Sequence, residues 1–154
     1  MDEVKRIIDN SLLVPEIARL VAEGKSVTLK TKGNSMLPFI RGERDSVLLV
    51  NPGEIKLYDI VLAKTYERQY VLHRVVSIDG NRLKLMGDGN LRECETCSLQ
   101  DILAVAVEII KKNSTTYNCR SNWHRWQAVA WYVLLPVRKY MLAIYKIMDK
   151  IIGL

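Results

Sequence analysis

The chain has 154 residues, 26% of them charged, and a net charge of +6. This length fits one domain with a substantial core, and the ordinary composition excludes a low-complexity or disordered chain. The positive charge is unevenly placed, because residues 1–119 hold 17 Lys and Arg against 16 Asp and Glu, whereas residues 120–154 hold 6 against 1. A basic, apolar tail suits an anionic membrane surface or an acidic partner, so we expect no nucleic-acid partner.

The cysteines indicate a cytoplasmic protein. There are three of them, an odd number that argues against a secreted disulfide scaffold. The first 25 residues mix charged and apolar side chains and lack the apolar core of a signal peptide. Cys94 and Cys97, with Cys119 and His124, would formally make a zinc set, but the second pair falls in a predicted linker. Free thiols are the favoured interpretation, and we expect no metal and no cofactor.

In chain order, the first predicted element is a short helix over residues 15–23, with Pro15 in its first turn and Gly24 at its end. Short apolar segments then alternate with turns rich in Gly, Pro, Asn and Asp, which is typical of an antiparallel β domain. The predicted strands are residues 26–32, 46–50, 59–64, 70–78, 82–86 and 102–110. The expected fold class is therefore mainly β: a compact, mostly antiparallel core at 26–110 in a domain at 1–118.

Residues 119–154 have a different character and are expected to form a helical C-terminal extension. Residues 126–137 are nearly unbroken apolar sequence, and residues 140–154 are amphipathic. A membrane-spanning helix needs about 20 apolar residues, and Pro136 interrupts this run, so a helical hairpin or bent helix is predicted. Residues 123–154 could lie on a membrane surface through their tryptophans and lysines, or the helices could pack back on the β domain. Both alternatives remain open.

The segment at residues 33–38, Gly-Asn-Ser-Met-Leu-Pro, sets Ser35 at a tight turn just after a strand. An exposed hydroxyl beside a free backbone N–H can serve as a nucleophile and an oxyanion donor. The alternative is a serine that merely caps the turn continued by Pro38.

His73 is a lone histidine in an otherwise apolar strand, on the same face as Val71 and Val75. Serine needs a base to take its proton, and imidazole, with an ordinary pKa of about 6.5, suits this role at neutral pH. A buried histidine bonded to a backbone carbonyl is the alternative. Lys64, at the end of a strand, is a second candidate base.

Asp88 lies on a glycine-flanked turn, Gly87-Asp88-Gly89-Asn90. If strands 70–78 and 82–86 pair as a hairpin, Asp88 can lie near His73, fix its tautomer and stabilise the imidazolium. A plain solvent-facing turn is the alternative.

These segments, in this order, resemble the conserved boxes of the signal peptidase I and SOS-repressor peptidase superfamily, over about residues 26–110. His73 stands where bacterial signal peptidases and self-cleaving repressors have lysine, which looks like the endoplasmic-reticulum and archaeal branch. The resemblance implies Ser35 as nucleophile, His73 as base and Asp88 as the orienting acid. Further residues of the same boxes are expected to border the substrate: Gly33, Asn34, Met36, Pro38 and Arg74.

The function expected from this resemblance is that of a serine endopeptidase of signal-peptidase type. It would cleave a precursor or leader peptide through an acyl-enzyme, and the peptide would bind as an added β-strand. One rival is a peptide-binding or regulatory module that keeps the fold without cutting. Another is a peptidase that processes only itself, which would require a cleavable segment in this chain.

Overall fold

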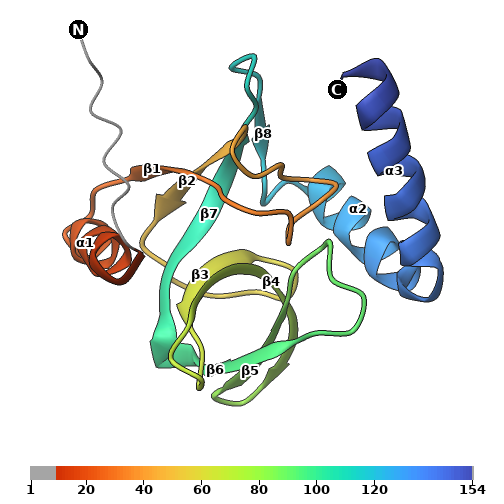
Figure 1. Cartoon of the computed structure of the whole chain (residues 1–154). Coiled ribbons are helices and arrows are strands. Elements are labelled where there is room, and N and C mark those ends of the chain that lie inside the picture. Colours follow the sequence, from red (N-terminus) through yellow and green to blue (C-terminus); the bar gives the residue numbers. More distant parts are fainter. Residues whose placement is uncertain (1–9, 154) are drawn as a thin grey trace, which may run out of the picture.

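The computed structural model describes residues 10–153 and confirms a mainly antiparallel β fold with helices at both ends (Figure 1). A helix, α1 (Asn10–Ala22), precedes eight strands, and a second helical part follows them. The strands are β1 (Val27–Lys30), β2 (Ser46–Val50), β3 (Ile60–Lys64), β4 (Tyr70–Asp79), β5 (Arg82–Met86), β6 (Glu95–Ser98), β7 (Ile102–Ile110) and β8 (Thr116–Asn118). A single helical turn, η1 (Leu99–Asp101), leads into β7.

The strands form one curled sheet in the order β1-β2-β7-β3-β4-β5-β6. Strand β8 pairs with the C-terminal end of β7. Every pairing is antiparallel. In Figure 1, β3 to β6 curve into a small half-barrel, and β7 runs from it to β2 and β8. The predicted 70–78 and 82–86 hairpin is present, with Arg74 opposite Met86.

Strand β3 is buried along most of its length because it separates two apolar cores. Ile60 and Leu62 belong to the core beneath α1 and β2, whereas Val61 and Ala63 belong to the core inside the half-barrel. Successive side chains of a strand point to opposite faces, so this unbroken apolar run serves both cores. Strand β7 does the same, with Ala104 and Val105 on opposite sides.

The first helix is longer than its predicted 15–23 range, and Pro15 lies inside it rather than in its first turn. Its buried stripe explains the difference: Val14, Ile17 and Val21 recur at helical spacing and face the first core. This packing begins before Pro15 and outweighs the preference of proline for a helix start.

Two strands escaped the sequence prediction. Strand β8 lies in the predicted polar linker, and its three residues are all exposed, so no apolar alternation marks it. Strand β6 is only four residues long and, among the strands of residues 10–153, pairs with β5 alone, with Glu95 opposite Leu85. A strand of three or four residues is too short to display a clear apolar alternation.

The C-terminal segment folds as two helices that pack on the β domain, one of the two alternatives left open. Helix α2 (Asn122–Val133) is followed by the short turn η2 (Leu135–Val137) and by α3 (Arg138–Ile152). Trp131 and Leu142 form a third small core with Leu37, which belongs to the predicted nucleophile turn. The division at residue 118 therefore separates two parts that share a core. Among residues 10–153, no helix combines the length and apolarity needed to cross a membrane.

Candidate active site

Ser35 lies in the turn that follows β1, and buried neighbours hold this turn in place. Met36 and Ile40 reach into the first core, and Leu37 packs against α2 and α3. The carbonyl of Ser35 accepts a hydrogen bond of 2.8 Å from the backbone N–H of Gly89. This bond ties the turn to the 87–90 segment, so two of the predicted boxes are in direct contact.

His73 lies in β4 opposite Val61 of β3, and only 6% of it is exposed. Its Nδ1 lies 2.8 Å from Oε2 of Glu95, the first residue of β6. A carboxylate accepts a hydrogen bond from Nδ1–H, and this leaves Nε2 as the unprotonated, basic nitrogen of a neutral ring.

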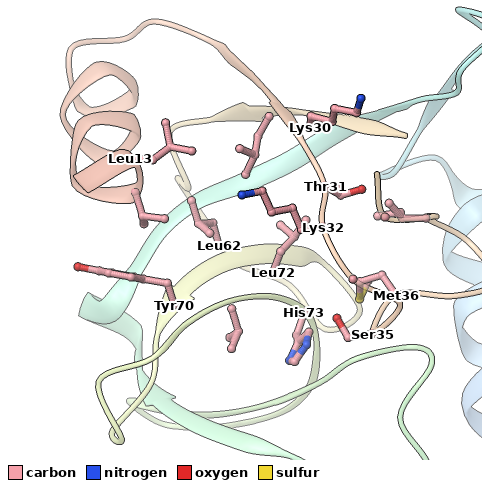
Figure 2. A pocket seen from close by; sticks show the side chains of 16 residues that line it. Leu13, Lys30, Thr31, Lys32, Ser35, Met36, Leu62, Tyr70, Leu72 and His73 are labelled. Carbon is pink, nitrogen blue, oxygen red and sulfur yellow. The ribbon is translucent and has the colours of Figure 1, made fainter. Parts of the chain in front are cut away.

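The close approach of Gly87 shows how near Ser35 lies to His73. A Cβ atom on Gly87 would lie 3.1 Å from Nε2 of His73 and 2.4 Å from the carbonyl oxygen of Ser35. Any side chain at position 87 would collide with this backbone, so glycine is required there. Figure 2 shows the hydroxyl of Ser35 beside the imidazole of His73 at one end of a groove that both residues line.

Asp88, the predicted orienting acid, does not contact His73. Its two carboxylate oxygens accept hydrogen bonds from Nε and Nη2 of Arg74, at 2.8 and 2.7 Å, and both side chains are buried. Burial by itself would lower the pKa of Arg74, but the charge of Asp88 and its hydrogen bonds outweigh burial and raise it. The carboxylate next to His73 is Glu95 instead.

Arg74 also departs from its predicted place at the substrate. Adjacent strand residues point to opposite faces, so Arg74 points away from the side that His73 faces. Its guanidinium lies 5.4 Å from the ring centroid of Phe39, and it also donates to the carbonyl of Tyr58. The Arg74–Asp88 pair is thus part of the support beneath the 87–90 segment. Of the other predicted substrate neighbours, Gly33 and Met36 line the groove.

The sequence analysis missed Glu95 because its position depends on β6, a strand that no clear sequence pattern marks. Val75 pairs with Leu85, and Leu85 pairs with Glu95, so Glu95 lies two strands away from β4 on the face shared with His73. Recognising β6 would have brought this residue into consideration.

The groove beside Ser35 has a volume of about 280 Å³ and lies between the chain at residues 29–33 and β4 at residues 70–73. Both walls offer strand edges, because within the described residues β1 pairs only with β2, and the pairing of β4 with β5 begins at Arg74. Leu13, Leu62 and Leu72 make its floor and far end largely apolar. In Figure 2 the amine of Lys32 lies over the groove, whereas that of Lys30 points away.

Two alternative sites from the sequence are not assembled. Lys64 does not line the groove, and its Nζ lies 5.8 Å from the ring centroid of Tyr70. Cys97 and Cys119 belong to different cores, and residues 10–153 contain no cluster of three or more His, Cys, Asp or Glu side chains that could hold a metal.

No protein-family model matches the chain, and no curated protein matches it either.

Proposed function

We propose that this chain is a serine endopeptidase in which Ser35 is the nucleophile, His73 the general base and Glu95 the residue that orients His73. One observation carries the proposal: Nε2 of His73 lies beside the Ser35 turn while Nδ1 is bonded to Glu95. This order of hydroxyl, imidazole and carboxylate is the arrangement that activates a serine. The resemblance of residues 26–110 to signal peptidases supports the roles of Ser35 and His73, whereas the role of Glu95 rests on its contact with His73.

The proposed reaction begins when Nε2 takes the proton of the Ser35 hydroxyl as its oxygen attacks the scissile carbonyl carbon. The backbone N–H of Ser35 stabilises the oxyanion that forms. The imidazolium then gives its proton to the leaving amine, the peptide bond breaks, and an ester to Ser35 remains. Water, deprotonated by Nε2, hydrolyses this ester and restores the free hydroxyl. Glu95 holds the ring and offsets its positive charge.

The substrate we propose is an extended segment of a precursor or leader peptide. Its backbone would add to the open edges of β1 and of β4 at residues 70–73, and its side chains would enter an apolar groove. All three cysteines are free thiols, which supports a cytoplasmic location.

The test is covalent labelling with a serine-directed acylating probe, read by intact mass from pH 5 to pH 9. The wild type should gain one adduct, and Ser35→Ala and His73→Ala should gain none. Ser77→Ala is the matched control, because Ser77 is an exposed serine of β4 and its loss should leave labelling unchanged.

Two results would contradict the proposal. A folded wild type that is never labelled would favour the peptide-binding module, for which the open strand edges are sufficient. Labelling that survives His73→Ala but is lost in Lys64→Ala would move the base to Lys64.

A further inference from the structure

The C-terminal helix pair, residues 122–152, contacts the β domain with one side only. On α3 the inward side consists of Arg138, Leu142, Tyr145 and Asp149, which recur at helical spacing and are buried or half-buried. The opposite side is apolar and uncovered. Six large side chains, each at least 59% exposed, define what we call the docking face: Trp123, Trp126, Val133, Tyr140, Ile147 and Ile151.

This amount of exposed apolar surface requires an explanation. Single exposed apolar residues are normal on a protein, but an apolar stripe along two helices and their connecting turn marks an interaction site. On α3 the stripe has the period of the helix, so it is a continuous face.

The charges that the helix pair itself places beside the docking face have one sign. Lys139, Lys146 and Lys150 are exposed and lie on one side of α3, between the apolar stripe and the inward side. Asp149, the single carboxylate of residues 120–154, forms an ion pair with Arg41. The other basic side chains of the pair are engaged, since Arg125 bonds to Asp59 and Arg138 is buried.

We propose that the docking face binds the surface of a membrane that contains anionic lipids. The apolar side chains would enter the boundary between headgroups and acyl chains, and the lysines would extend along it to reach the phosphates. Trp123 and Trp126 stack with their ring centroids 5.7 Å apart and are both exposed, and tryptophan is enriched at this depth of a membrane.

A second copy of the chain fits this face less well. In a symmetric dimer the same patch meets itself, so two sets of three lysines would be brought together, and the helix pair has no unpaired acidic side chain to place between them. An anionic membrane supplies the missing negative charge. Helix α2 has 12 residues and α3 has 15, so the pair is suited to lie on a membrane rather than to cross it.

Membrane docking would also set the position of the groove, because the helix pair is bonded to the active-site segment. Nε1 of Trp131 donates a hydrogen bond of 2.8 Å to the carbonyl of Asp88, and Arg138 donates one of 2.9 Å to the carbonyl of Asn90. Between these two residues, Gly89 bonds to Ser35. A lipid-bound helix pair would therefore hold Ser35 at a fixed height above the membrane.

The test is flotation of the full-length chain with vesicles of phosphatidylcholine alone or mixed with phosphatidylglycerol. The wild type should float with the mixed vesicles, and added salt should weaken this binding. Ile147→Asp combined with Ile151→Asp should remove binding to both kinds of vesicle. The matched control, Ile78→Asp with Leu99→Asp, changes exposed apolar residues of the β domain and should float like the wild type.

A second pair of variants isolates the charge. Lys146→Gln with Lys150→Gln should lower partition into the mixed vesicles by roughly tenfold and leave partition into phosphatidylcholine unchanged. Lys56→Gln with Lys84→Gln removes the same charge from elsewhere on the surface and should have little effect.

Two outcomes would overturn the inference. One is a folded wild type that never floats. The other is a wild type that forms dimers in sedimentation at rising concentration, while the Ile147 and Ile151 variant stays monomeric and neither protein binds vesicles. The second outcome would assign the face to a second copy. Because flotation needs no peptidase activity, it is independent of the labelling test of Ser35.

Discussion

Two carboxylates bond to neighbouring residues of β4 and have opposite surroundings. Glu95 bonds to His73 beside the groove, and 22% of its side chain is exposed, whereas Asp88 is sealed against Arg74 with 4% exposed. The two basic partners are neighbours on β4 and point to opposite faces of the sheet. A carboxylate that is close in sequence to the predicted histidine can therefore be structural, while the carboxylate that contacts this histidine comes from a strand farther along the chain.

The largest effect should come from a substitution in the Glu95–His73 pair, which is partly open to solvent. Glu95→Gln keeps a hydrogen-bond acceptor beside Nδ1 but removes the charge that stabilises the imidazolium. We expect the acylation rate to fall by roughly 10²–10⁴-fold with the fold intact. Probe kinetics and urea unfolding measure the two properties separately. Glu93→Gln, an exposed glutamate two residues earlier, is the control, and an equal loss of rate in both variants would remove Glu95 from the mechanism.

A substitution in the buried Arg74–Asp88 pair, the sealed pair, should mainly lower the stability of the fold. Asp88→Asn leaves the Arg74 guanidinium buried without a counter-charge, which costs about 3–5 kcal/mol of unfolding free energy. Urea denaturation measures this change. Arg74→Met combined with Asp88→Leu removes both charges and should recover much of the loss. If Asp88→Asn unfolds like the wild type but is not acylated, Asp88 acts in the chemistry after all.

A smaller effect on stability is expected at His124, whose ring packs against Phe39 behind the sealed pair. Burial, and then the positive charge of Arg74, lower the pKa of His124 to about 4. Since the ordinary value of about 6.5 applies to the unfolded chain, unfolding takes up a proton between these two pH values, and stability should fall as the pH drops through this window. His124→Phe retains a ring against Phe39 and should reduce this loss, by about 2 kcal/mol at pH 4. Urea midpoints of both proteins from pH 4 to pH 8 measure it, and identical pH profiles would contradict the assignment.

The smallest effect concerns the open side of the site. Among the described residues, Lys30 and Lys32 are the only Lys, Arg, Asp or Glu side chains that line the groove. We expect peptides with an acidic residue opposite Lys32 to be cut faster, and Lys32→Glu to lower kcat/KM for them by roughly fivefold. Lys30→Glu is the matched control, because its amine points away from the groove (Figure 2). A preference that Lys32→Glu leaves unchanged would locate the selectivity elsewhere.

The sequence was sufficient for the parts of the fold that carry a strong local pattern. Residues 46–50, 82–86 and 102–110 were predicted with the observed bounds, because apolar alternation and turn residues mark them. The proximity of the Ser35 turn to His73 followed from a resemblance between motifs. The Glu95 contact did not, because it depends on how β6 pairs with β5, and pairing between strands is a tertiary property.

For Glu95 a contact with His73 was missed, whereas for Asp88 a contact with His73 was predicted that the structure does not show. A glycine-flanked acid after a strand is compatible with either face of the sheet, and its neighbours in sequence do not say which. The deciding fact is that Arg74 points to the same face as Asp88 and needs a buried counter-charge there. An arginine inside an apolar strand is therefore a signal to look for its acid before assigning that acid elsewhere.

The position of β3 between two cores also determines how the molecule comes apart. Ile60 and Leu62 pack in one core, and Val61 and Ala63 pack in the other. Because β3 belongs to both cores, neither core can lose its packing without disturbing the other. Thermal melting should therefore follow a single cooperative transition, with amide hydrogens in β3 and the middle of β7 the last to exchange with deuterated solvent.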